Sequence, residues 1–168
     1  MTRTLIRHIL AAAVLTAPVL TGCHHIDSKR LPSVPVSIVF NSAAEWNTYG
    51  VAGALDYRYF IKTEKEREPA NFPYSVSTYT GFGGVLLVCD LYGNPRAYDL
   101  SCPVECKRDV RIQVDTDGHI ARCPVCKSTY AVFENFGHPL SGPAAEHGYG
   151  LECYNVIPGT AQYFTITR

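Results

Sequence analysis

Two short cysteine pairs constrain this 168-residue chain more than any other feature of its sequence. The first pair has the spacing C-x3-C and the second has C-x2-C, and residues 107–122 separate them. A proline follows the leading cysteine of each pair and stiffens a tight turn. Thiolates on two such turns can converge on one metal ion. The sequence therefore predicts a metal site with the ligands Cys102, Cys106, Cys123 and Cys126.

The N-terminus has the pattern of a bacterial secretion signal that ends in a lipidated cysteine. A basic start and an apolar run lead to Leu-Thr-Gly-Cys, with Cys23 as the last residue. This resembles the lipobox of bacterial lipoproteins, which implies cleavage before Cys23 and lipidation of its thiol. Residues 1–22 are then a signal peptide and residues 23–33 a lipidated tether. An uncleaved membrane helix is the alternative, but the apolar run is short and Pro18 interrupts it.

A lipid anchor places the protein in the bacterial cell envelope, attached to a membrane by acyl chains. His24, in place of aspartate, follows the anchor cysteine and favours the outer membrane. Removing the signal removes two arginines and no acid, so a formal charge of zero becomes minus two. The one basic run, residues 62–67, alternates lysine with glutamate. Nucleic-acid binding is therefore excluded, and no small-molecule substrate can be identified.

Short alternating or β-branched segments separated by turn residues dominate residues 34–168. One short helix is expected after Ser42, which suits an N-cap, and residues 63–79 are expected to form an exposed loop that could serve for docking. The predicted fold is one all-β domain, a small sandwich or barrel with a two-loop, rubredoxin-like metal-binding subdomain at about residues 97–145. The expected strands are 34–40, 55–61, 85–91, 96–100, 110–114, 119–122, 129–133, 151–157 and 162–167.

Cys89 and Cys153 lie outside the paired motifs, within apolar segments of β-strand character. We expect them to be core thiols or a disulfide between neighbouring strands. Exported thiols normally oxidise, so disulfides are also an alternative for the two cysteine pairs. Whether Cys89 and Cys153 pair cannot be told from the sequence.

From about Gly84 onward, the order of motifs resembles the Rieske iron-sulfur domain family. A strand leads to Cys102-Pro; Cys123-Pro-Val-Cys-Lys-Ser-Thr-Tyr130 follows; then come a Gly142-Pro-Ala loop and Tyr154-Asn-Val. The resemblance covers about half of the chain and implies the family's β fold. It also implies that Ser128 and Tyr130 donate hydrogen bonds to a cluster or cysteine sulfur.

The ligand positions depart from the family pattern. The first family histidine falls on Val104, which cannot bind metal, and the second falls on Cys126. The fourth ligand is then Cys106, displaced along the first loop, and no histidine occupies a motif position. Glu105 is interpreted as a solvated loop carboxylate. Lys127, where the family has glycine, puts a cation beside the site.

Three states of the site remain open, and the family resemblance alone favours the first, an iron-sulfur electron-transfer module. An all-cysteine [2Fe-2S] cluster would make the protein a low-potential electron carrier that needs a redox protein partner. A zinc ion fits the spacing equally well and would make it a metal-stabilised binding module. Without metal, paired disulfides would leave a surface lipoprotein scaffold. Because no catalytic triad and no phosphate-binding glycine loop can be read, none of the three is an enzyme.

Overall fold

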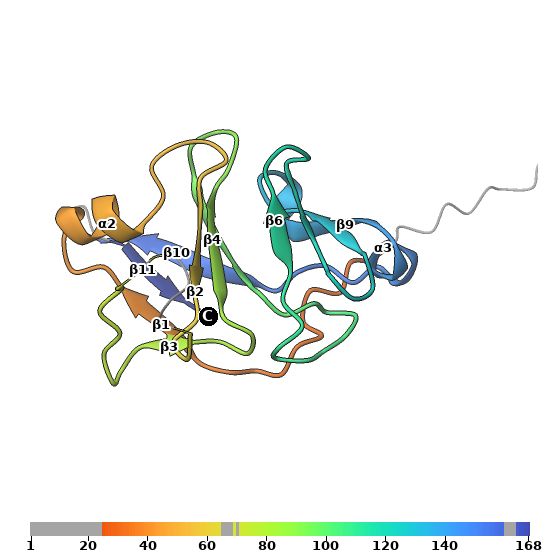
Figure 1. Cartoon of the computed structure of the whole chain (residues 1–168), viewed down its shortest axis with the longest axis horizontal. Helices are drawn as coiled ribbons and strands as arrows, with labels where there is room; N and C mark the ends of the chain where they lie inside the picture. The colour runs from red at the N-terminus through yellow and green to blue at the C-terminus, as the bar shows by residue number, and fades with distance from the viewer. Residues whose placement is uncertain (1–24, 65–68, 70, 160–163) are drawn as a thin grey trace, which may run out of the picture.

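The computed structural model describes residues 25–64, 69, 71–159 and 164–168. Two antiparallel sheets lie at the two ends of the molecule, the larger on the left of Figure 1 and the smaller on the right. The larger sheet has the order β2-β4-β5-β10-β11-β1-β3, and the smaller has the order β6-β7-β8-β9. The strands of the larger sheet are β1 (Val36–Val39), β2 (Tyr57–Phe60), β3 (Tyr79–Thr80), β4 (Val85–Cys89), β5 (Pro95–Asp99), β10 (Cys153–Pro158) and β11 (Phe164–Thr167).

The smaller sheet contains β6 (Gln113–Asp115), β7 (Ile120–Arg122), β8 (Thr129–Ala131) and β9 (His138–Ser141). A 3-10 turn, η1 (Asn135–Gly137), precedes β9, and a short helix, α3 (Pro143–His147), follows it. Each of the two cysteine loops leads into or lies within this sheet. The prediction of an all-β fold with a two-loop subdomain at one end is therefore confirmed.

Strand β4 joins the two halves of the hydrophobic core. All five of its residues are buried, and successive side chains of a strand point to opposite faces. Leu86 and Val88 pack in the cluster that contains Cys102, Cys123 and the smaller sheet. The alternate residues of β4 pack in a second cluster, between β1, β2 and β11. The cysteine loops thus rest on the same strand that organises the rest of the domain.

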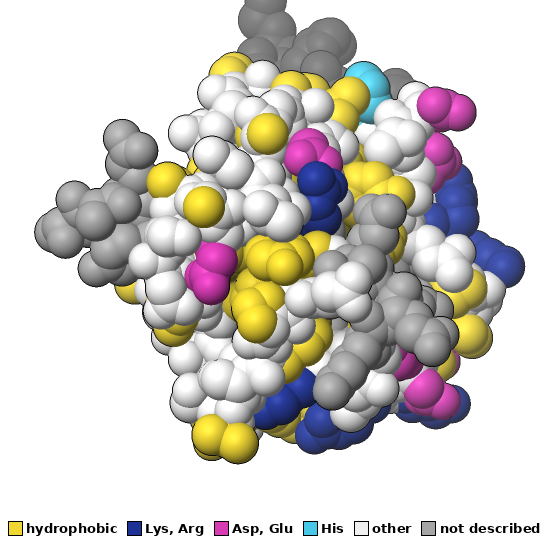
Figure 2. Space-filling model, turned by 60° about the vertical axis from the view of Figure 1, so that its left-hand side comes forward, with side chains coloured by type: hydrophobic (Ala, Val, Ile, Leu, Met, Phe, Trp, Pro, Cys, Tyr) yellow, Lys and Arg dark blue, Asp and Glu magenta, His cyan; other side chains and the backbone are white. Residues whose placement is uncertain are grey.

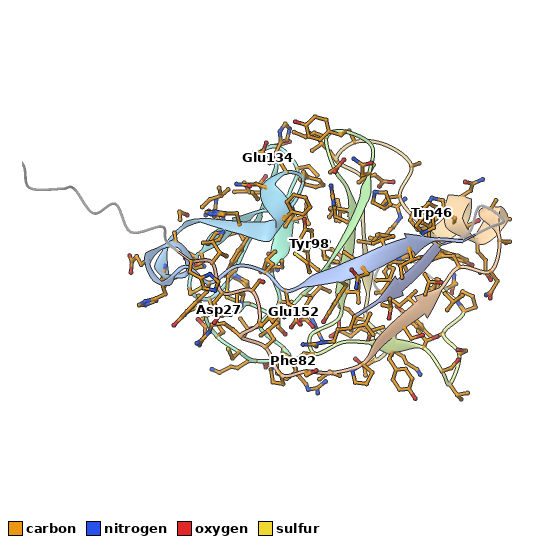
Figure 3. The ribbon with its side chains drawn as sticks, turned by 180° about the vertical axis from the view of Figure 1, so that it is seen from behind. Asp27, Trp46, Phe82, Tyr98, Glu134 and Glu152 are labelled. Atoms are coloured by element: carbon orange, nitrogen blue, oxygen red, sulfur yellow. The ribbon has the colours of Figure 1, made fainter. Side chains whose placement is uncertain are left out.

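Helix α2 (Ala43–Tyr49) is the short helix expected after Ser42. Ser42 Oγ accepts a hydrogen bond from the Glu45 N–H at 3.2 Å, and the Glu45 carboxylate accepts from the Asn41 N–H at 2.6 Å. The first bond is the N-cap bond that stabilises the helix start, and the second connects Glu45 to the residue before the N-cap. Trp46 packs on Phe164 with ring centroids 4.0 Å apart. Figure 3 shows Trp46 at the end of the molecule remote from the smaller sheet.

The segment expected as an exposed loop, residues 63–79, contributes to the core. Phe72 is buried and packs edge-on against Phe40 and Phe60 with centroid distances of 5.7 and 5.1 Å. Tyr79 starts strand β3, which pairs with β1. The expectation of a wholly exposed loop was wrong because an aromatic side chain in a charged, proline-containing segment gives no periodic signal. Residues 65–68 and 70 of this segment lie outside the described residues.

Cys89 and Cys153 both have free thiols. Cys89 ends β4 and is buried, as expected of a core thiol, whereas Cys153 begins β10 and is exposed. Strand β5 lies between β4 and β10, so the two cysteines are not on neighbouring strands. The expectation of a core thiol therefore holds for Cys89 and was wrong for Cys153.

The face shown in Figure 2 mixes hydrophobic side chains with charges of both signs, and no single sign dominates it. Within the described ranges, no helix has both the length and the apolar character needed to cross a bilayer. The predicted signal peptide, residues 1–22, and the predicted lipidation site, Cys23, lie outside those ranges.

Candidate metal centre

Three of the four predicted ligands converge. The sulfurs of Cys102, Cys123 and Cys126 all lie within 4.8 Å of one another, and Cys102 and Cys126 are 3.6 Å apart. Cys102 and Cys123 are fully buried, whereas Cys126 is half-buried. These are free thiols at a separation that excludes a disulfide, whose bond is about 2.05 Å long. Among the described residues, this group contains no histidine and no carboxylate.

Backbone hydrogen bonds close the two loops that carry these thiols. The Cys102 N–H donates to the Val110 carbonyl at 3.0 Å, and the Cys123 N–H donates to the Ser128 carbonyl at 2.9 Å. The first loop follows β5 and the second connects β7 to β8. Because each loop is closed directly at its leading cysteine, main-chain hydrogen bonds fix the backbone of both leading cysteines.

The fourth predicted ligand does not join the group. Cys106 lies outside the set of sulfurs within 4.8 Å of one another. Its backbone has a φ of 51°, and its thiol donates to the Pro103 carbonyl of its own loop at 3.1 Å. The Cys106 side chain therefore folds back over its own loop.

The hydroxyls of Tyr130 and Ser128 both lie within hydrogen-bonding distance of the thiols, although Ser128 accepts from Cys126 where the family resemblance implied a donor. The Tyr130 hydroxyl lies 3.4 Å from Cys102 Sγ. The Cys126 thiol donates to Ser128 Oγ at 3.2 Å, and Ser128 Oγ also accepts from the Ala144 N–H at 3.0 Å. When Cys126 is ionised, the serine proton is free to donate to the thiolate. Ser128 and Tyr130 are both fully buried, so their hydroxyls have fixed positions beside the sulfurs.

The three thiols have different proton affinities. Burial raises the pKa of Cys102 to about 12, although hydrogen bonds from Tyr130 and the loop backbone oppose the shift. Burial also raises the pKa of Cys123. Burial acts in the same direction on Cys126, but hydrogen bonds from Ser128 and the neighbouring thiols outweigh it and hold the pKa of Cys126 below its ordinary value. Cys126 is therefore the first thiol available to a cation.

Lys127 does not place its charge over the thiols. Its Nζ donates to the Pro124 carbonyl at 2.5 Å, and the side chain is exposed. The residue has a φ of 63°, the conformation that glycine adopts most easily. Lys127 thus fills the position of the family's glycine at the cost of a strained backbone.

A buried carboxylate that the sequence analysis missed fixes the start of the first loop. Asp99, at the end of β5, accepts hydrogen bonds from the N–H groups of Phe82 and Ser101 at 2.8 Å and of Gly83 at 3.0 Å. It also accepts from the Tyr154 hydroxyl at 2.6 Å. Through the Ser101 N–H, the Asp99 carboxylate holds the residue that precedes Cys102. The repeated glycines at 81–84 were the available signal, since a Cβ on Gly83 would meet Ser101 Oγ at 2.0 Å.

The segment predicted as a tether lies against the cysteine subdomain from residue 25 onward. The Asp27 N–H donates to the Gly148 carbonyl at 2.7 Å, and Figure 3 shows Asp27 at the end of the molecule that carries α3. The Arg30 guanidinium stacks 3.9 Å above the Tyr149 ring, and its Nε donates to the Pro103 carbonyl at 3.3 Å. A cation is thus held directly beside the first cysteine loop.

The sulfurs fit a single tetrahedral ion. A zinc–sulfur bond of about 2.3 Å gives a tetrahedron whose edges are about 3.8 Å long. The distance of 3.6 Å between Cys102 and Cys126 is close to that edge. A two-iron cluster instead divides its four ligands into two pairs on separate irons. The Cys102, Cys123 and Cys126 sulfurs all lie within 4.8 Å of one another and show no division into pairs.

Comparisons with known proteins add one distant likeness. No family model and no curated protein matches this chain. Among solved structures, a Mycobacterium tuberculosis protein assigned as the small subunit of an NADH-dependent nitrite reductase aligns with a TM-score of 0.40 and 11% sequence identity. The alignment covers 81% of this chain and 97% of that one. A likeness this distant does not tell us what the present chain binds.

Proposed function

We propose that this protein is a metal-binding module of the bacterial cell envelope whose centre is a single ion held by cysteine thiolates, with zinc as the favoured ion. The observation that carries the proposal is the convergence of the Cys102, Cys123 and Cys126 sulfurs within 4.8 Å of one another. Tetrahedral thiolate sites select zinc or iron over harder cations, because thiolate is a soft ligand. Zinc would supply Lewis acidity without redox chemistry.

Side chains at the site favour the thiolate form that a cation would bind. Cys126, whose pKa is lowered, offers the first thiolate, and Tyr130 and Ser128 stabilise the charge that develops on the sulfurs. Cys102 and Cys123 release their protons as the ion binds, since thiolates and not thiols are the ligands. The loops do not need to move to bring these three sulfurs together.

The predicted lipid anchor at Cys23 is part of this proposal and would attach the module to a membrane, with the outer membrane favoured. The docked segment from Asp27 to Arg30 supports a short connection, because it leaves few residues between the predicted anchor and the domain. Mass spectrometry of the mature N-terminus tests this part directly. An acylated peptide that begins at Cys23 is expected, and an unprocessed N-terminus would contradict it.

An iron-sulfur electron carrier is the second candidate, and the contacts of Tyr130 and Ser128 with the cysteine sulfurs favour it. In the Rieske family, which the sequence resembles, such hydroxyls tune the reduction potential of a [2Fe-2S] cluster. This function would require a redox protein partner at the envelope. It would also require Cys106 to leave the Pro103 carbonyl and turn towards the other three sulfurs.

Metal analysis of the full-length protein, produced without oxygen, separates the two candidates. We expect a colourless protein with one zinc per chain. A brown protein with two irons and two acid-labile sulfides would refute the single-ion centre and establish the electron carrier. A protein without metal and without free thiols would refute both candidates and leave a disulfide-linked scaffold.

A further inference from the structure

The two cysteine loops share the same local turn geometry. Both begin with Cys-Pro-Val, and in both loops two successive backbone N–H donors act to lower the pKa of the leading thiol, against the effect of burial. The donors are two and three residues beyond the leading cysteine in each case. They are Val104 and Glu105 for Cys102, and Val125 and Cys126 for Cys123.

The residue four positions beyond the leading cysteine also matches between the loops. Cys106 has a φ of 51° and Lys127 has a φ of 63°, both in the left-handed region. The Cys106 thiol donates to the Pro103 carbonyl at 3.1 Å, as the Lys127 ammonium donates to the Pro124 carbonyl at 2.5 Å. Cys106 is therefore the counterpart of Lys127, which is not a ligand.

This register assigns a different residue to the ligand position of the first loop. Cys126 is three residues beyond its leading cysteine, and the residue three beyond Cys102 is Glu105. The Glu105 carboxylate is not part of the group of ligand atoms that lie within 4.8 Å of one another, so it does not fill that position. The C-x3-C spacing thus moves the second cysteine one residue past the position from which a side chain reaches the ion. The left-handed turn at Cys106 then directs its thiol onto its own loop.

We infer that the centre is a three-thiolate site in which Cys106 is not a ligand, and that the fourth coordination position is open to a small exogenous donor, such as water or a low-molecular-weight thiol. This inference rests on the proposed function. Zinc sites that react with outside molecules have three protein ligands and an open fourth position, whereas structural sites are closed by four.

The exposure of the three sulfurs places the open position towards solvent. Cys102 and Cys123 are fully buried, and Cys126 is half-buried. Val125, next to Cys126, is 55% exposed. Three thiolates on a divalent ion leave one net negative charge, and Arg30 Nη2 lies 3.9 Å from Cys106 Sγ at the same rim. A cation there offsets the charge and allows a further anionic donor such as a thiolate to approach.

The absorption spectrum of the cobalt(II)-substituted protein reports the number of thiolate ligands, because each thiolate adds to the sulfur-to-metal charge-transfer absorption. We expect full-length Cys106→Gly to bind one cobalt with the intensity of the wild type. Cys102→Ser, Cys123→Ser and Cys126→Ser should each lose about one third of that intensity, as three equal ligands require. Lys127→Gly is the matched control, because it introduces glycine at the equivalent turn position of the other loop.

A reverse experiment builds the missing ligand. The double substitution Glu105→Cys with Cys106→Gly gives the first loop the same ligand spacing as the second. We expect its charge-transfer intensity to rise by about one third and its cobalt affinity to rise at least about tenfold, as closure by a fourth thiolate requires. Added 2-mercaptoethanol should change the ligand-field spectrum of the wild type but not that of the closed variant.

The outcomes separate this inference from the proposed function. If the wild type binds no cobalt, both are overturned. If it binds cobalt but Cys106→Gly loses as much intensity as Cys102→Ser, then Cys106 is a ligand, and only the three-thiolate centre is overturned. Failure of the double variant to gain intensity while it binds one cobalt would also overturn the register between the two loops.

Discussion

Tyr154→Phe tests the buried network that holds the first cysteine loop. The Tyr154 hydroxyl donates to Asp99 Oδ2 at 2.6 Å, and both side chains are buried. The substitution leaves the aromatic ring in place and removes one donor from a buried carboxylate. A hydrogen bond to a charged group contributes about 1.5–3 kcal/mol to stability. At about 3 °C per kcal/mol for a domain of this size, a loss of about 2 kcal/mol lowers Tm by about 6 °C.

Tyr98→Phe is the matched control for this substitution. The Tyr98 hydroxyl is also buried, but it donates to the neutral carbonyl of Val132 at 3.1 Å. Hydrogen bonds between neutral groups contribute about 0.5–1.5 kcal/mol, so this variant should lose about half as much stability. Urea unfolding of both variants and the wild type, monitored by circular dichroism, measures the difference.

The pH dependence of the Tyr154→Phe deficit identifies Asp99 as its source. Burial raises the pKa of Asp99, and the Tyr154 hydroxyl is the first of the hydrogen bonds that oppose this shift. Removing the hydroxyl raises the pKa of Asp99 in the folded state further, so the folded variant keeps its proton to a higher pH. The deficit should therefore grow as pH rises through the pKa of Asp99 and shrink below it. Equal deficits for Tyr154→Phe and Tyr98→Phe at every pH would refute a charged, hydrogen-bonded Asp99.

Three further predictions concern the metal centre and its surroundings. Because the pKa of Cys102 is about 12 and burial raises that of Cys123, both thiols must lose a proton to bind zinc near neutrality. Zinc affinity should therefore rise with pH by at least about two logarithmic units per pH unit in competition titrations, and a flat profile would contradict thiolate ligation. Tyr130→Phe should lower zinc affinity by about tenfold, since it removes a hydroxyl that contacts the Cys102 sulfur. An unchanged zinc affinity would show that this contact contributes only to packing. Arg30→Ala should lower the free energy of unfolding in urea by about 0.5–1 kcal/mol through loss of the stacking on Tyr149, and no loss would show that backbone bonds alone hold the segment.

Local sequence signals located most of the larger sheet and helix α2, because the strands are short alternating or apolar runs bounded by turn residues and the helix has an explicit cap. Strand β9 and helix α3 were missed for physical reasons. Pro139 lies within β9, where it removes a backbone donor, and five residues are too few for α3 to show helical periodicity. Gly142 has a φ of 72° and separates the two elements, so the sequence from β9 to α3 predicts a single loop.

The site was predicted in part from cysteine spacing. Spacing alone brought Cys102, Cys123 and Cys126 together, because tight turns closed at their leading cysteine leave few arrangements. It could not decide the role of Cys106, which depends on the sign of one backbone angle. Alignment of the two Cys-Pro-Val repeats was the signal that could have done so. The Asp99 network was missed because most of its donors are backbone N–H groups, so the glycines at 81–84 were the one sequence signal for it.

The buried thiols of Cys102 and Cys123 are part of the hydrophobic core as well as candidate metal ligands. Cys102 and Cys123 belong to the cluster that includes Leu86 and Val88 of β4, and their raised pKa values keep them neutral in the absence of an ion. A neutral thiol packs as a small apolar group, so the protonated sulfurs suit their place in the core. In the proposed centre, metal binding would exchange these protons for a cation. Because Cys102 and Cys123 pack in the same cluster as β4, such an exchange would act directly on the packing of the core.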